Sequence, residues 1–258
     1  MLGRPSTVFP AEPHERKMPL PLYTRLLRLC VCLAAISAAS ALAFAKTAAS
    51  AFPPPERPVA SIISPIWHSE DERDAAKEVP QVAGFLGIEP GMTVADIGAG
   101  SGYYAVRLSP LLGENGRVIA EDVMPDYLRL LEAKMRDLHL QNITITIGQP
   151  DDPKLQPNSV DRAILIHMYH EISQPFALLY HLAAALKPGA KVGIVDALRR
   201  TPEHGTPPAL LRCELQAMGY VQTAFHALDG SAAYLAIFEL PAGKSPTPPA
   251  EVKPCKEE

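Results

Sequence analysis

The sequence predicts an α/β fold: a doubly wound, seven-stranded sheet, mostly parallel, that ends in an antiparallel hairpin. Three observations predict it. Short apolar stretches typical of strands alternate with stretches of helical periodicity, which favours parallel strands joined by right-handed crossovers. A glycine-rich loop, 98–102, follows the first strand. The turn that joins the last two strands, 228–231, is so short that they can only pair antiparallel.

The elements follow from periodicity and from helix signals. Pro125 opens one helix, because proline suits a first helical turn, and Ser173 is expected to cap the next, which stops at Lys187-Pro-Gly189. The predicted strands are short and apolar or alternating, and they span 92–97, 117–122, 143–147, 162–166, 191–195, 220–225 and 233–238. The helices between them span 104–111, 125–138, 175–186 and 209–218. A further helical segment is expected from Ser64 onward.

The N-terminus has the pattern of a targeting segment. Residues 1–45 contain an apolar run, 29–44, after two arginines, and an Ala-x-Ala cleavage signal ends at Ala45. The run is short for a membrane span. We therefore expect an exported, periplasmic protein, with a membrane anchor at residues 29–44 as the alternative. Whether the chain starts at Met1 or Met18, and whether the signal is cleaved, stays open.

The remaining boundaries follow from composition. We expect a proline-rich linker at 46–61, a folded domain at 62–240 and a disordered tail at 241–258. Cys213 and Cys255 lie outside the targeting segment, and the sequence leaves open whether they pair.

Charge limits the class of partner. The formal net charge is −4, and 20% of the residues are charged. A surface that binds nucleic acid is normally basic. The sequence therefore favours a small-molecule partner, with no nucleic acid, no stable protein partner, and a membrane only if the N-terminal segment is retained.

The glycine loop is the strongest functional signal. Ligands of such sheets bind beyond the carboxyl ends of the strands, where this loop lies. The pattern is Asp96-x-Gly98-x-Gly100-x-Gly102, with Ala99 inside it. A dinucleotide fingerprint would need glycine at position 103, which is tyrosine here. This departure disfavours a NAD-dependent oxidoreductase.

These residues resemble motif I of the class I S-adenosylmethionine-dependent methyltransferases, and the likeness covers about 90–240. In that family the acidic residue holds the amino-acid end of S-adenosylmethionine, and the glycines let the ligand lie against the backbone. The resemblance implies S-adenosyl-L-methionine as the cofactor and assigns its binding to the loop residues Asp96, Gly98, Ala99, Gly100 and Gly102.

Two further ligand contacts are implied by the resemblance. A carboxylate at the end of the second strand takes the ribose hydroxyls in the family; Glu121 and Asp122 both stand there, and Pro125 selects Asp122. A residue after the third strand contacts the adenine, and here either Gln149 or Asp151 fits that role.

Candidate catalytic residues follow the fourth strand in His167-Met-Tyr-His170-Glu171. If the acceptor is a hydroxyl or an amine, a base can help, and histidine titrates near neutrality. We expect His167 or His170 as the base, with Glu171 orienting an imidazole. We expect no metal site, because the zinc-protease spacing is absent and no cysteine pair stands nearby.

The sequence therefore predicts an S-adenosylmethionine-dependent methyltransferase with an unidentified small-molecule acceptor. The alternatives are an exported, non-catalytic binding protein on the same fold and, less favoured, a NAD-dependent oxidoreductase. Arg199 and Arg200, in the segment after the fifth strand, hint at an anionic acceptor.

Overall fold

The computed structural model describes residues 51–62 and 70–257. The predicted targeting segment, the possible anchor at 29–44 and the first residues of the predicted linker lie outside this range. Within it, every helix is too short or too polar to cross a membrane.

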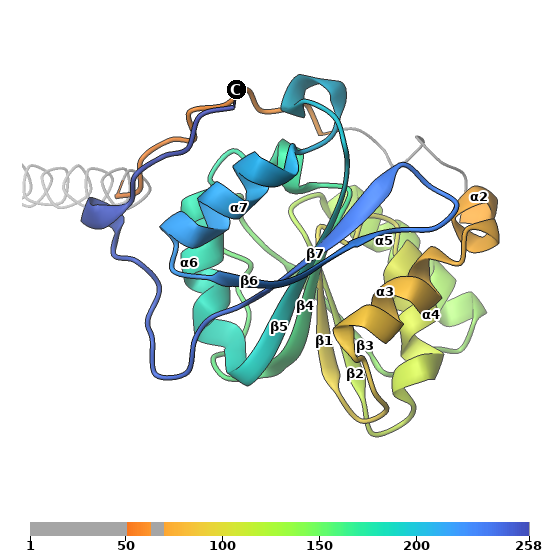
Figure 1. Cartoon of the computed structure of the whole chain (residues 1–258). Helices are drawn as coiled ribbons and strands as arrows, with labels where there is room; N and C mark the ends of the chain where they lie inside the picture. Colours follow the sequence, from red (N-terminus) through yellow and green to blue (C-terminus); the bar gives the residue numbers. More distant parts are fainter. Residues whose placement is uncertain (1–50, 63–69, 258) are drawn as a thin grey trace, which may run out of the picture. The chain divides into compact units, whose positions relative to one another are not determined.

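The seven strands form one sheet in the order β3-β2-β1-β4-β5-β7-β6, which confirms the predicted fold class (Figure 1). All neighbouring strands are parallel except the pairs that β7 makes with β5 and β6. Their bounds are β1 Thr93–Ile97, β2 Arg117–Asp122, β3 Ile143–Ile147, β4 Val160–Ile166, β5 Leu186–Ala197, β6 Val221–Ala227 and β7 Ala233–Glu239.

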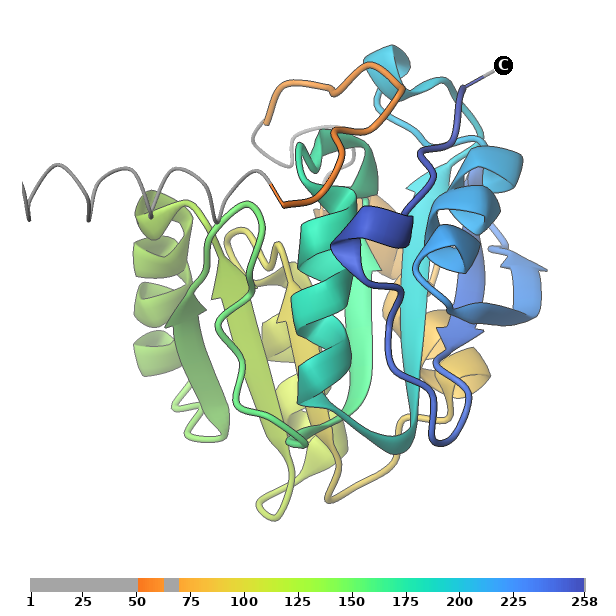
Figure 2. The same ribbon diagram turned by 90° about the vertical axis from the view of Figure 1, so that its left-hand side faces the viewer.

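Helices cover both faces of the sheet (Figures 1 and 2). One face carries α3 (Glu78–Leu86), α4 (Tyr103–Leu112) and α5 (Pro125–Asp137); the other carries α6 (Pro175–Ala185) and α7 (Pro208–Ala217). The short helix α2 (Glu70–Ala75) precedes α3. The predicted cap of α6 differs, because Gln174 is the N-cap residue and gives no side-chain bond.

The sheet has one hydrophobic core on each face, because the side chains of its strands alternate between the two faces. In β4, Ala163 and Leu165 are buried in the core under α6 and α7, whereas Ile164 is buried in the core under α3, α4 and α5. Successive side chains of a strand point to opposite faces. The fully buried part of β4, residues 163–165, is therefore apolar on both sides, as a parallel sheet between two helical layers requires.

The predicted disordered tail is instead packed on the domain, which corrects that prediction. A disulfide joins Cys213 of α7 to Cys255, and Val252 is buried in the core under α6 and α7. Lys256 forms an isolated parallel bridge with Glu56 of the predicted linker. Composition alone does not reveal these tertiary contacts, which hold the segment in place. The structure also settles the open question about the cysteine pair.

The described part of the predicted linker is anchored as well. The guanidinium of Arg57 forms an ion pair of 3.0 Å with Glu214, and both side chains are fully buried. The same guanidinium donates to the backbone carbonyls of Tyr169 and His170. These contacts fix the segment beside the turn that follows β4.

Candidate functional site

A cavity of about 380 Å³ lies at the carboxyl ends of β1, β2, β4 and β5. The glycine loop, the end of β2 and the turn after β4 all contribute to its lining. Most of the predicted site residues line it together: Asp96, Gly98, Ala99, Gly100, Asp122, Gln149, His167, His170 and Glu171. Gly102 and Asp151 do not.

The glycines of the loop have two different roles. A Cβ on Gly98 would lie 2.8 Å from Cε of Met168, at the cavity wall. A Cβ on Gly102 would lie 2.3 Å from Cδ1 of Leu131, and this glycine has a φ of 86°. Gly102 therefore lets α4 begin close against α5; it does not line the cavity, and its contact with the cofactor stays a prediction.

Asp96 has the character of a ligand-binding carboxylate. It is 2% exposed, and its Oδ2 atom has no hydrogen-bond partner among residues 51–62 and 70–257. Burial raises its pKa to about 7; the positive charge of Arg73 opposes the shift and the charge of Asp122 adds to it. A buried carboxylate oxygen without a partner is costly, and an amino group bound in the cavity would satisfy it.

Asp122 braces the glycine loop from the end of β2. Its Oδ2 atom accepts a hydrogen bond from the N–H of Gly100, and its Oδ1 atom accepts one from the N–H of Met124, both at 2.8 Å. Burial raises the pKa of this carboxyl, and these N–H groups oppose the shift. Each carboxylate oxygen can accept a second bond, so both can still take ribose hydroxyls.

Glu121, the neighbour of Asp122 that Pro125 does not select, also lines the cavity. It is 2% exposed, and burial, with the charge of Asp122, raises its pKa to about 8. Its Oε1 atom has no hydrogen-bond partner in the described part of the chain. The side chain packs against Gly148, where a Cβ would lie 1.7 Å from Oε1.

The two candidates for the adenine contact are now separated. Gln149 lines the cavity, whereas Asp151 does not. The backbone carbonyl of Asp151 accepts a hydrogen bond from Nδ1 of His181, on the outer side of α6. Of the two candidates, Gln149 is the one that lines the cavity, and its contact with adenine stays a prediction.

His167 is fixed at the end of β4. Its φ is 53°, a left-handed conformation that few residues other than glycine adopt, and its N–H donates to the carbonyl of Val195. Its Nε2 atom lies 3.2 Å from Oε2 of Glu78. Burial opposes ionisation of Glu78, but the contacts with His167 and Arg73 outweigh it and lower its pKa to about 2. Glu78 is therefore ionised beside the imidazole.

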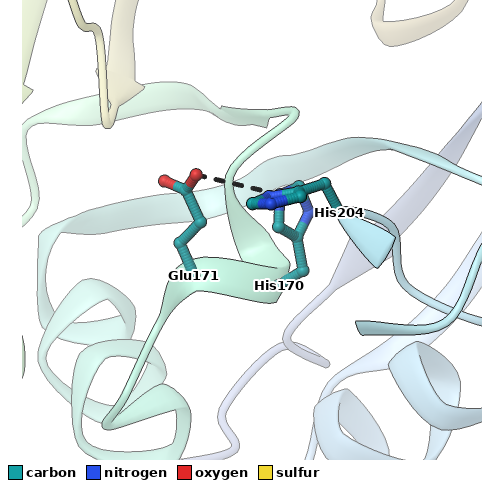
Figure 3. Close-up of side chains that lie close together, drawn as sticks. All are labelled: His170, Glu171 and His204. Atoms are coloured by element: carbon teal, nitrogen blue, oxygen red, sulfur yellow. Dashed lines mark ion pairs between the residues drawn. The ribbon is translucent and has the colours of Figure 1, made fainter. Parts of the chain in front are cut away.

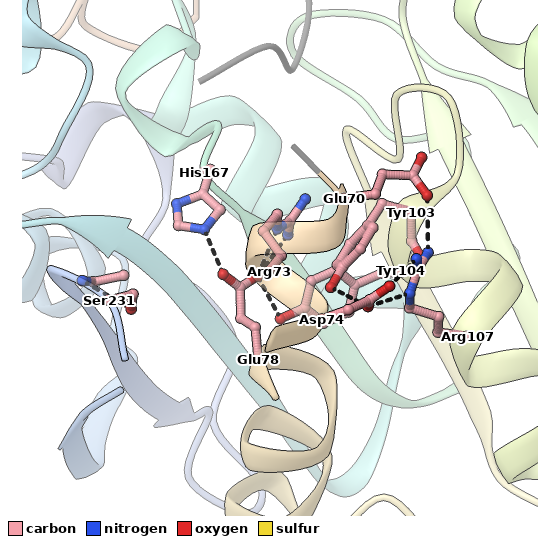
Figure 4. A network of polar contacts seen from close by, with 10 residues as sticks. Glu70, Arg73, Asp74, Glu78, Tyr103, Tyr104, Arg107, His167 and Ser231 are labelled. Carbon is pink, nitrogen blue, oxygen red and sulfur yellow. Dashed lines mark hydrogen bonds and ion pairs between the residues drawn. The ribbon is translucent and has the colours of Figure 1, made fainter. Parts of the chain in front are cut away.

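Glu78 also belongs to a polar network that joins α2 and α3 to α4 (Figure 4). The guanidinium of Arg73 contacts Glu78 at 2.6 Å and lies 3.8 Å from the ring centroid of Tyr103. The hydroxyls of Tyr103 and Tyr104 donate to Asp74 and Glu78. Both tyrosines also line the cavity. The network thus sets the position of the wall beside His167.

His170 is held by a different carboxylate. It is 3% exposed, and its Nδ1 atom lies 3.0 Å from both carboxylate oxygens of Asp196 at the end of β5. Asp196 also accepts a hydrogen bond of 2.6 Å from the hydroxyl of Thr206. Glu171 is 3.9 Å from Nε2 of His170, too far for a hydrogen bond. Glu78 and Asp196 are the carboxylates that contact the two imidazoles, and the orienting role of Glu171 stays a prediction.

Comparison with known proteins agrees with this geometry. A family model described as a methyltransferase domain matches residues 94–189. The demethylmenaquinone methyltransferase of Oceanobacillus iheyensis is 25% identical over 141 residues, which are 55% of this chain and 56% of that protein. The ubiquinone/menaquinone biosynthesis C-methyltransferase UbiE of a Shewanella species is 26% identical over 119 residues, 46% of this chain and 47% of that protein. The chain thus spans about half the length of these curated relatives.

A solved structure shares the fold. The crystal structure of a SAM-dependent methyltransferase from Aquifex aeolicus superposes with a TM-score of 0.60 and 23% identity, and covers 67% of this chain and 99% of that one. The strand order, the loop at the end of β1 and the matched family model agree with one another. The chain therefore has the sheet topology of the class I S-adenosylmethionine-dependent methyltransferases, and its residues 94–189 match a methyltransferase domain.

Proposed function

We propose that the protein transfers a methyl group from S-adenosylmethionine to a small-molecule acceptor. The observation that carries the proposal is the position of Asp96, Gly98 and Asp122 on one cavity, with a buried oxygen of Asp96 that lacks a partner in the described residues. S-adenosylmethionine is the methyl donor of this class, and it supplies an electrophilic methyl group on a sulfonium.

The residues present fit this donor. Asp96 would hold the ammonium group, because an oppositely charged group compensates a buried carboxylate. Asp122 would hold the ribose, and Gln149 would contact the adenine. The backbone of residues 98–100 would lie against the ligand.

His167 is the base that we assign to the acceptor. With Nε2 donating to Glu78, its Nδ1 atom can accept a proton, and the ionised Glu78 stabilises the imidazolium that forms. Alignment of the acceptor is the other contribution, since proximity and orientation alone can supply a large share of the rate. A small-molecule acceptor is also supported by the names of the quinone-biosynthesis relatives.

Calorimetry tests the donor site. S-adenosylmethionine, S-adenosylhomocysteine and NAD would be titrated into the full chain and into Asp122→Ala, with Asp126→Ala as the control at an exposed aspartate. We expect both adenosyl ligands to bind the parent and the control, and to bind Asp122→Ala at least about tenfold more weakly, since charge-assisted bonds contribute 1.5–3 kcal/mol. Binding of NAD alone would favour an oxidoreductase. Binding without transfer of labelled methyl to any acceptor fraction would favour the non-catalytic alternative.

We also propose that the protein works in an oxidising compartment outside the cytosol, as the predicted targeting segment suggests. The disulfide between Cys213 and Cys255 supports this, because such bonds persist mainly in oxidising compartments. Alkylation of free thiols in intact cells would test it. Modification of both cysteines without prior reduction would refute the proposal.

A further inference from the structure

Three potential metal ligands meet at the wall of the cavity: His170, Glu171 and His204 (Figure 3). We call them the histidine–carboxylate cluster. His170 and Glu171 lie in the 3-10 turn η1 (Tyr169–Glu171), and His204 directly follows the 3-10 turn η2 (Thr201–Glu203). One ligand atom from each lies within 4.8 Å of the other two, and all three residues line the cavity.

The donor set is one that transition metals select. Two imidazoles and one carboxylate hold catalytic zinc, and the same set holds iron in the 2-His-1-carboxylate sites. Such sites leave at least one coordination position open. An open position here would face the cavity that the donor-binding residues also line.

An outer carboxylate completes the pattern. Asp196 contacts Nδ1 of His170 through its carboxylate, and the hydroxyl of Thr206 donates a hydrogen bond to the same carboxylate. Metal-binding histidines almost always donate a hydrogen bond from their other ring N–H to such an acceptor. This bond fixes the tautomer and raises the basicity of the nitrogen that binds the metal. This arrangement leaves Nε2 of His170 directed toward Glu171 and His204. A purely structural role for His170 would not require Glu171 and His204 to lie beside its Nε2 atom.

The ligand atoms of the three residues lie slightly farther apart than in a metal-bound site, but they can move closer. With metal–ligand bonds of about 2.1 Å, neighbouring ligand atoms lie about 3–3.5 Å apart. The distance from Nε2 of His170 to the Glu171 carboxylate is 3.9 Å. Glu171 and His204 are both partly exposed and lie on short turns, so small side-chain rotations close the difference. His170 stays fixed by Asp196.

We propose that His170, Glu171 and His204 bind one divalent transition-metal ion, of the Zn²⁺ class, at the acceptor end of the cavity. Asp196 is the positioning residue of the site. Its open position would take an oxygen of the acceptor. The acceptor role of the open position rests on the proposed methyl transfer, whereas metal binding itself does not, because none of the three ligands is assigned to the donor.

Metal titration of the full, untagged chain tests the site. Zn²⁺ would be titrated by calorimetry, Co²⁺ would be followed by visible absorption, and Mg²⁺ would serve as the hard-cation comparison. The ligand variants are His204→Ala and Glu171→Gln, which avoid the buried His170. The control is His226→Ala, whose ring stacks on Phe85 away from the cavity.

We expect one equivalent of Zn²⁺ to bind the parent and the control with equal affinity, and far more tightly than Mg²⁺. Each ligand variant should bind at least about 100-fold more weakly, and Asp196→Asn about 10–100-fold more weakly. The Co²⁺ spectrum should change in the ligand variants and not in His226→Ala. Absence of Zn²⁺ binding to the parent, or equal binding by folded His204→Ala and Glu171→Gln, would overturn the proposal. Unchanged thermal unfolding of these variants without metal establishes that they fold.

Discussion

Replacement of Asp96 by asparagine separates the stability of the domain from its ligand affinity. Burial raises the pKa of Asp96 from an ordinary 3.8 to about 7. The folded protein thus binds this proton more tightly than the unfolded chain does. The stabilisation is present below pH 4 and is lost as the pH rises through 7. At pH 8 the ionised carboxylate costs the ligand-free protein about 4 kcal/mol. Asp96→Asn should recover much of that amount.

Affinity for S-adenosylmethionine should change in the opposite direction. The ligand's ammonium group needs the ionised carboxylate, so acid weakens binding as Asp96 takes up a proton. With a pKa of about 7, the apparent affinity of the parent should fall about eightfold from pH 7.5 to pH 6. The variant should bind more weakly at pH 7.5 and lack this component. The groups of the ligand titrate in the same way with both proteins. The ratio of the two affinities therefore reports the ionisation of Asp96 alone.

The assay pairs two measurements on the ligand-free and ligand-bound protein. Urea unfolding at pH 4 and pH 8 gives the free energy of unfolding, and calorimetry at pH 6 and pH 7.5 gives the affinity. Asp126→Asn, at an exposed aspartate paired with Arg129, is the matched control and should change neither. If Asp96→Asn is no more stable than the parent at pH 8, or if the affinity ratio is independent of pH, then Asp96 is not the buried ligand-binding carboxylate argued above.

Four other changes test the remaining parts of the molecule. Replacing Cys213 by serine should lower the free energy of unfolding by about 4 kcal/mol in urea titrations, because the bond closes a loop between residues 42 apart in sequence, and the parent in reducing agent should lose as much. Gly102→Ala should cost at least about 1 kcal/mol, measured by thermal unfolding, through its positive φ and its contact with α5. His167→Ala should lower kcat by about 10²–10⁴ with little change in the affinity for S-adenosylmethionine, whereas Glu78→Gln should lower kcat less and shift its pH profile. An unchanged kcat in His167→Ala would remove this histidine as the base.

The fold and the residues that meet around the cavity were predictable because their signals are local. Strand and helix periods, the glycine loop and the acid at the end of β2 all lie within short stretches, and parallel strands bring their carboxyl ends to one edge. Asp96, Gly98 and Asp122 meet for that reason. Gly102 packs against Leu131 of α5. A positive φ is required both at ligand loops and at tight helix contacts, and the sequence does not distinguish the two.

The acid partners of the histidines were not predictable from local pattern. Glu78 lies 89 residues before His167 and Asp196 lies 26 residues after His170. One signal did exist, because Asp196 ends a buried apolar strand next to β4, where an acid faces the residues that follow β4. Glu121 was missed for another reason: the proline rule selected one of two adjacent acids, although both line the cavity.

The tail, which composition predicts to lie outside the folded domain, supports the loop that carries His204. Glu257 of the tail accepts hydrogen bonds from the N–H and the hydroxyl of Thr201, the first residue of η2, and its side chain is 2% exposed. His204 follows η2 directly. The disulfide at Cys255 holds the tail in place two residues earlier. Reduction should therefore loosen the loop that carries His204 while leaving Asp96 and Asp122 in place. Zn²⁺ affinity should fall on reduction more than affinity for S-adenosylmethionine does, and an equal loss of both would mean that the tail supports the whole domain rather than this loop.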